Sequence, residues 1–116
     1  MGYNSYDVGL FYDCQLESLY LGRNIQYKTG YDYEYSPFCE NKTLKSVTIG
    51  NSVTSIKSYA FQNCSNLETI KFSNNLKTIG EGAFTGCSKI KELNLPSTLE
   101  KIHAYAFENC TGITEL

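Results

Sequence analysis

The 116-residue sequence lacks the features that mark several large classes of protein. Its 10 basic residues are scattered among 12 acidic ones, without the basic patch that nucleic-acid binding needs. No apolar run approaches the roughly 18 residues of a membrane span. Neither GxGxxG nor GxxxxGKS/T occurs, so the common glycine-rich phosphate loops are absent. We therefore expect no nucleic-acid partner, no membrane insertion and no cofactor.

What the sequence has instead is a 23-residue period. Phenylalanine, alanine, isoleucine and cysteine all recur at this step, and one period shared by several columns indicates structural repeats. An earlier copy, FYDCQLESLYLGRNI, is one residue short. With that copy included, the two columns expected to form the structural ladder are Phe11, Phe38, Phe61, Phe84 and Phe107, and Cys14, Cys64, Cys87 and Cys110.

Each copy predicts two brief strands joined by a turn. An apolar trio such as Leu67, Ile70 and Phe72 ends in the alternation of a half-buried strand. A turn such as SNN follows, and then a second apolar pair, Leu76 and Ile79. The return segment is too short for more than one turn of helix. We expect a solenoid of stacked 23-residue coils, about 4.8 Å apart, with short parallel β-strands on two sides and short helical or irregular return segments.

The motifs L-x-x-I-x-F and L-x-x-V-x-I resemble the strand signature of leucine-rich repeats. The period, the second strand V-T-S-I and the A-F-x-x-C-x-x-L block narrow the resemblance to the BspA-type leucine-rich repeat. This resemblance implies a non-enzymatic, secreted or cell-surface protein of mucosal microbes that adheres to host matrix proteins or to other cells. It supplies no catalytic or ligand residues to transfer.

The period also predicts how the chain is organised. Residues 1–10 form an N-terminal edge or cap, and residues 11–116 form the repeats. The coils start near residues 11, 38, 61, 84 and 107, and the last is incomplete. The first coil carries an insertion at about residues 26–37. Because the last coil has no polar cap, we expect either a longer array or end-to-end self-association there.

The insertion and one exposed column are the candidate partner-binding surfaces. Tyrosine offers a large contact area at a low rotamer cost, and insertions in solenoids often lie on a binding face. The alternative is that the tyrosines are packing groups that cover the N-terminal end of the core. The candidate residues are Tyr27, Tyr31, Tyr33 and Tyr35 of the insertion, and Tyr20, Thr48, Lys71 and Asn94 along the main strands.

Other reactive groups suggest no chemistry. The five cysteines contain no C-x-x-C pair of the kind that metal sites use, so the column predicts reduced, buried thiols. Cys39 lies outside the column and is the best candidate for a reactive or intermolecular thiol. His103 is expected on an exposed turn. Glu92 and Glu115 are expected on a flat, solvated face, in one column with Ser18, Ser46 and Thr69, without a pocket that would shift a carboxyl pKa. We expect no catalytic and no metal-binding residue.

Two functions fit this pattern. The first is a binding or adhesion module that contacts host matrix proteins, glycoproteins or other cells through many weak contacts. The alternative is a structural spacer with no partner of its own. An extracellular or surface location follows only from the family resemblance, since the first ten residues do not resemble a secretion signal.

Overall fold

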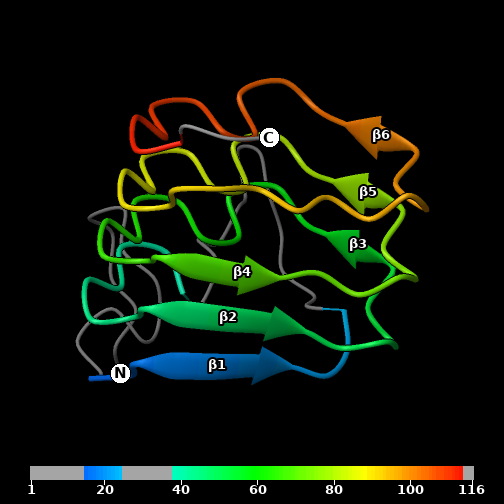
Figure 1. The fold of residues 1–116 in the computed structure, drawn as a ribbon, viewed down its shortest axis with the longest axis horizontal. Helices are drawn as coiled ribbons and strands as arrows, with labels where there is room; N and C mark the ends of the chain where they lie inside the picture. The colour runs from blue at the N-terminus through cyan, green and yellow to red at the C-terminus, as the bar shows by residue number, and fades with distance from the viewer. Residues whose placement is uncertain (1–14, 25–37, 114–116) are drawn as a thin grey trace, which may run out of the picture.

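The computed structural model describes residues 15–24 and 38–113, which form two parallel β-sheets (Figure 1). The main sheet has the order β1-β2-β4 and consists of β1 (Ser18–Leu21), β2 (Ser46–Ile49) and β4 (Thr69–Lys71). The second sheet has the order β3-β5-β6 and consists of β3 (Ser55–Ile56), β5 (Thr78–Ile79) and β6 (Lys101–Ile102). No helix occurs in the described ranges. The predicted solenoid is confirmed, and its return segments are turns.

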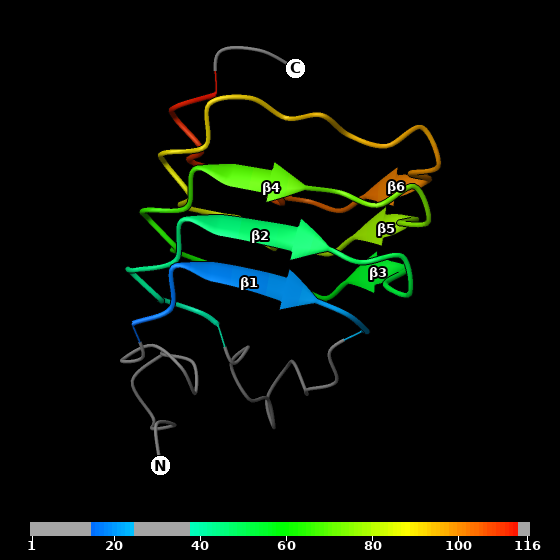
Figure 2. The same cartoon turned by 60° about the horizontal axis from the view of Figure 1, so that its bottom comes forward.

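In both sheets, each strand pairs with the equivalent strand of the next coil. In the main sheet Ser46 pairs with Thr69, and in the second sheet Ile56 pairs with Ile79, which is the 23-residue step. β1 joins the same stack through the pairing of Ser18 with Ser46. Figure 2 shows the two sheets as adjacent sides of one stack. Equivalent residues of successive coils therefore lie beside one another along both sheets.

The core is a row of stacked aromatic rings between the sheets and the return segments. The ring centroids of Phe38 and Phe61 are 5.7 Å apart, those of Phe61 and Phe84 5.4 Å, and those of Phe84 and Phe107 5.4 Å. The edge of Phe72 meets Phe84 at 6.3 Å. Burial removes these large rings from water, and the parallel stacking follows from the repeat. The same core contains Ala60, Ala83 and Ala106, Ile56 and Ile79, and Cys64, Cys87 and Cys110.

The return segments join neighbouring coils by alternating hydrogen bonds. The N–H groups of Tyr59, Phe61 and Asn63 donate to carbonyl groups of the next coil, at 2.7–2.8 Å. The intervening N–H groups of Ala60 and Gln62 donate to carbonyl groups three residues earlier in their own coil. The segment therefore satisfies its backbone without a helix or strand.

Two positions in each return segment have a left-handed backbone. One column contains Tyr59, Gly82 and Tyr105, with φ of 60°, 62° and 62°. The other contains Glu40, Asn63, Gly86 and Asn109, with φ between 58° and 80°. Glycine adopts this conformation readily, whereas it is strained for a bulky residue. Turn geometry is therefore shared by all coils even where glycine is replaced.

The coil that starts at Phe84 forms a poorer main strand than its predecessors. Only an isolated bridge at Glu92 continues the main sheet in the described residues. Pro96 follows directly on Leu95 and has no N–H to donate. Leu95 ends the apolar trio of this coil and is 38% exposed.

Candidate binding surface

The outward face of the main sheet places one predicted column in a line. Tyr20 pairs with Thr48, and Thr48 pairs with Lys71, so these side chains follow one another from coil to coil. Tyr20 is 67% exposed, Lys71 is exposed and Thr48 is half-buried. Asn94 is exposed but lies outside any strand. The structure therefore brings three of the four strand candidates together in register.

Tyr20 is supported by a glycine of the next coil. A methyl group on Gly50 would lie 2.4 Å from Oη and 2.8 Å from Cζ of Tyr20, so the missing side chain makes room for the phenol. Covering a strand-end glycine with an aromatic ring is a recurrent way of stabilising β-sheets. Tyr20 thus presents an exposed ring in a defined position.

The neighbouring column contains a cleft that the sequence analysis did not anticipate. A cavity of about 480 Å³ lies beside the start of the main strands and is lined by Glu68, Thr69, Lys89, Lys91, Glu92 and Gly112. Glu92 is exposed, as expected of a solvated face, but the face around it is not flat. The strand that would continue the sheet is reduced to an isolated bridge at that residue. Glu115, the other acid of the column, lies outside the described residues.

The tyrosines of the insertion, Tyr27, Tyr31, Tyr33 and Tyr35, also lie outside the described residues. Whether they recognise a partner or cover the core remains a prediction. The ladder residues Phe11 and Cys14 lie outside the described residues as well.

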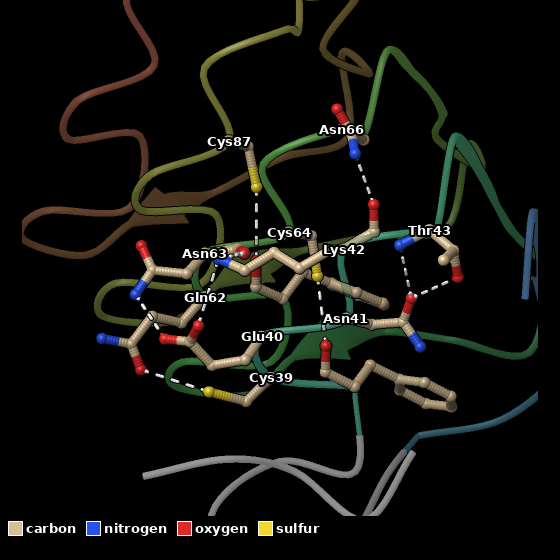
Figure 3. Close-up of polar contacts among 12 residues, drawn as sticks. Cys39, Glu40, Asn41, Lys42, Thr43, Gln62, Asn63, Cys64, Asn66 and Cys87 are labelled. Atoms are coloured by element: carbon tan, nitrogen blue, oxygen red, sulfur yellow. Dashed lines mark hydrogen bonds and ion pairs between the residues drawn. The ribbon is translucent and has the colours of Figure 1, made fainter. Parts of the chain in front are cut away.

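A polar cluster at the beginning of the second described segment ties two coils together (Figure 3). The Nζ of Lys42 lies 3.2 Å from Oε1 of Glu40, and Nδ2 of Asn63 donates to Oε2 of Glu40 at 2.7 Å. Nδ2 of Asn66 donates to the carbonyl oxygen of Lys42. These contacts join coils rather than converge on an open site, so the cluster is structural.

Asn41 occupies the cysteine column, which the sequence analysis missed. It lies three residues after Phe38, as Cys64 lies three residues after Phe61. Its buried Oδ1 accepts hydrogen bonds from the N–H groups of Thr43 and Leu44, both at 3.1 Å, and from Oγ1 of Thr43 at 3.0 Å. The constant spacing of three residues from the ladder phenylalanine was the signal that would have placed Asn41 in this column.

The ladder thiols are reduced and buried. Sγ of Cys64, Cys87 and Cys110 each donates to the carbonyl oxygen of a phenylalanine in the preceding coil, at 3.1–3.2 Å. Burial raises the pKa of Cys64 to about 12 and also raises the pKa of Cys87 and Cys110. A thiol with a raised pKa is a poor nucleophile at neutral pH. These residues are therefore structural.

The interpretation of Cys39 as a reactive thiol is wrong. Its side chain is fully buried, and its Sγ lies 3.6 Å from Oε1 of Gln62 in the next coil. The interpretation rested only on the position of Cys39 outside the cysteine column. The polar side chain of Gln62 instead lies against the sulfur.

The histidine and carboxylate side chains of the described residues form no metal centre. The side chain of His103 is exposed, and its backbone N–H donates to the carbonyl oxygen of Ile79. Within residues 15–24 and 38–113, no three His, Cys, Asp or Glu side chains are close enough to hold a metal ion. The same residues include no helix of the length and apolarity that a membrane crossing requires.

The stacked coils, two parallel sheets and phenylalanine row define a leucine-rich-repeat solenoid. Residues 34–116 match the family model described as the BspA type leucine rich repeat region, in six copies. The chain therefore belongs to the BspA-type leucine-rich-repeat family. No curated protein matches the sequence.

Two solved structures share the fold. A leucine-rich repeat protein from Bacteroides ovatus superposes with a TM-score of 0.72 at 30% identity, over 90% of this chain and 26% of that chain. A leucine rich cell surface protein from Faecalibacterium prausnitzii gives a TM-score of 0.62 at 24% identity, over 82% of this chain and 31% of that chain. This chain thus spans only about a quarter to a third of the length of these relatives.

Proposed function

We propose that this chain is a non-enzymatic binding module of an extracellular or cell-surface protein. It makes multivalent contacts with a protein or glycoprotein ligand on host matrix or on another cell. The observation that carries the proposal is the register that sets Tyr20, Thr48 and Lys71 side by side, one per coil. Weak contacts that repeat along a rigid face add up to useful affinity.

The family and the structural neighbours support an extracellular or cell-surface location and a non-enzymatic role. Leucine-rich repeats generally serve as interaction surfaces, and one structural neighbour is described as a cell surface protein. The buried thiols and the exposed, isolated His103 offer no nucleophile and base pair in the described residues.

The test is binding of the purified chain to immobilised matrix proteins, mucins and bacterial cells. Lys71→Ala should weaken binding by up to about fivefold, since a single exposed contact contributes up to about 1 kcal/mol. Lys101→Ala is the matched control, because Lys101 is an exposed strand lysine of the second sheet. Equal affinity of both variants and the parent chain would remove the main-sheet face from the proposal.

The insertion has its own test. Changing Tyr31, Tyr33 and Tyr35 together to alanine should abolish binding at an unchanged melting temperature if the segment recognises the ligand. A lowered melting temperature with binding retained would instead assign the tyrosines to packing. Absence of binding by the parent chain to every immobilised target would favour the spacer function.

End-to-end self-association is a further part of the proposal. Ile102 is 43% exposed, whereas its column-mates Ile56 and Ile79 are 2% and 0% exposed. This apolar surface supports packing of a second copy against the last described coil. Light scattering over a concentration series should show dimers, and Ile102→Lys should return the chain to a monomer. A monomer at all concentrations would exclude this contact.

A further inference from the structure

The return segments carry an aromatic and acidic surface that is separate from the main sheet. Tyr59, Gly82 and Tyr105 occupy one left-handed column, and Glu81 precedes the glycine. The N–H of Tyr59 donates to the carbonyl oxygen of Glu81 at 2.8 Å, which fixes the two coils against each other. We call these four residues the aromatic–acidic patch.

The ring of Tyr59 extends across the next coil. A methyl group on Gly82 would lie 2.4 Å from Cε1 and 2.5 Å from Cδ1 of Tyr59, so the ring occupies the space that a side chain at Gly82 would fill. The exposed Glu81 directly precedes Gly82, so Glu81 and the Tyr59 ring lie side by side on this coil.

Tyr105 continues the patch on the following coil. It is 61% exposed and shares the left-handed column of Tyr59 and Gly82. The two tyrosine backbones are two coils apart, or roughly 10 Å. Because the Tyr59 ring covers the intervening coil, the two rings and the exposed Glu81 carboxylate form one surface.

We propose that the aromatic–acidic patch binds a positively charged side chain, an arginine of a protein partner. Aromatic faces attract a cation within about 6 Å of the ring centre. A guanidinium can stack on a tyrosine ring while its N–H groups donate to a carboxylate such as Glu81. Charge complementarity selects this occupant over an acidic one.

The electrostatic surroundings agree with this choice. Burial, and then the charge and hydrogen bond of Glu81, raise the pKa of Tyr59, as does Tyr105. At neutral pH the Glu81 carboxylate supplies the negative charge of the patch. The patch lies on the return segments, so the inference stands apart from the ligand proposed for the main sheet.

The test is an NMR titration of the isotope-labelled chain with the peptide acetyl-Gly-Gly-Arg-Gly-Gly-amide. Saturable shifts are expected at residues 81–83 and 105–106. Tyr105→Ala and Glu81→Gln should each weaken the apparent affinity about two- to fivefold, since an exposed cation–π or ion-pair contact is of that size. Tyr105→Phe keeps the ring and should retain the affinity.

Two controls make the result specific. The same peptide with citrulline in place of arginine is neutral and nearly isosteric, and it should produce no saturable shift. Glu17→Gln removes an exposed carboxylate of the first described coil, away from the patch, and should leave the titration unchanged. The proposal is overturned if the arginine peptide gives no saturable shift, if the citrulline peptide binds equally well, or if Glu81→Gln has no effect.

Discussion

At the scale of single residues, the ladder thiols couple stability to pH. Each folded thiol has a raised pKa, so the folded state keeps its proton when the unfolded state has lost it. Stability is then full below the unfolded pKa of about 9 and falls as pH rises from about 9 to about 12, the folded pKa of Cys64. The melting temperature should decline over this window, as measured by circular dichroism.

The control for this decline is the triple variant Cys64→Ser, Cys87→Ser and Cys110→Ser. Serine retains a donor for the phenylalanine carbonyl groups but does not titrate in this range. The variant should show a shallower alkaline decline than the parent chain. Identical slopes would mean that other groups, not the thiols, cause the loss of stability.

The phenylalanine row gives a second residue-scale prediction. Phe84 is fully buried and contacts three other rings. Phe84→Ala should lower the free energy of unfolding by about 3–5 kcal/mol in urea denaturation. Phe107→Ala should cost less, because Phe107 is only half-buried and stacks on one described ring. A cost at Phe107 equal to that at Phe84 would contradict the described packing.

The sequence predicts such columns because their burial follows directly from the period. Phe61, Ile79 and Ala83 are fully buried, so residue type and position agree there. Asn41 was missed because the column changes residue type there: its Oδ1 accepts hydrogen bonds within its own coil, whereas the thiols donate to the preceding coil. The left-handed backbone of Tyr59 has no signature in the side chain, since the turn imposes it.

At the scale of elements, close contact between coils depends on Gly80. A methyl group there would lie 2.6 Å from the backbone N of Ser58 and 2.8 Å from the carbonyl carbon of Lys57. Backbone atoms cannot move aside without separating the coils. Gly80→Ala should therefore cost about 1–3 kcal/mol of unfolding free energy, measured by chemical denaturation.

Gly22→Ala is the matched control. The nearest side-chain atom to a methyl group at Gly22 is Cε2 of Tyr20 at 3.4 Å, which is an ordinary contact. This exposed substitution should change the unfolding free energy by no more than about 0.5 kcal/mol. If both glycine variants were equally stable, tight packing at Gly80 would not be what sets the spacing of the coils.

Strand lengths were less predictable from the sequence than strand positions. The apolar pair Leu76 and Ile79 correctly predicts β5 of the second sheet. In the main sheet, the trio Leu67, Ile70 and Phe72 contains β4, yet the equivalent trio Ile90, Leu93 and Leu95 forms only an isolated bridge at Glu92. Pro96, which has no N–H to donate, directly follows this trio, whereas Ser73 follows Phe72 in the preceding coil. The cleft beside Glu92 lies along this coil, where periodicity alone indicated a flat face.

At the scale of the whole molecule, the alternating hydrogen bonds of the return segments predict a gradient of protection. The N–H of Phe61 donates to Ala83 at 2.7 Å, and that of Phe84 donates to Ala106 at 2.8 Å. Within the described residues, the N–H of Phe107 has no backbone acceptor. Its amide should exchange with solvent about tenfold faster, or more, than those of Phe61 and Phe84, as measured by NMR hydrogen exchange.

The concentration dependence of this exchange separates two arrangements of the last described coil. If a second copy packs there, protection of the Phe107 amide should rise with protein concentration, while Phe61 and Phe84 stay unchanged. If the coil is free, exchange should be fast at every concentration. Strong protection of Phe107 at all concentrations would contradict both, because it would require an acceptor within the same chain. In a stack where each coil supplies acceptors for the preceding one, this single amide reports whether the array ends or continues.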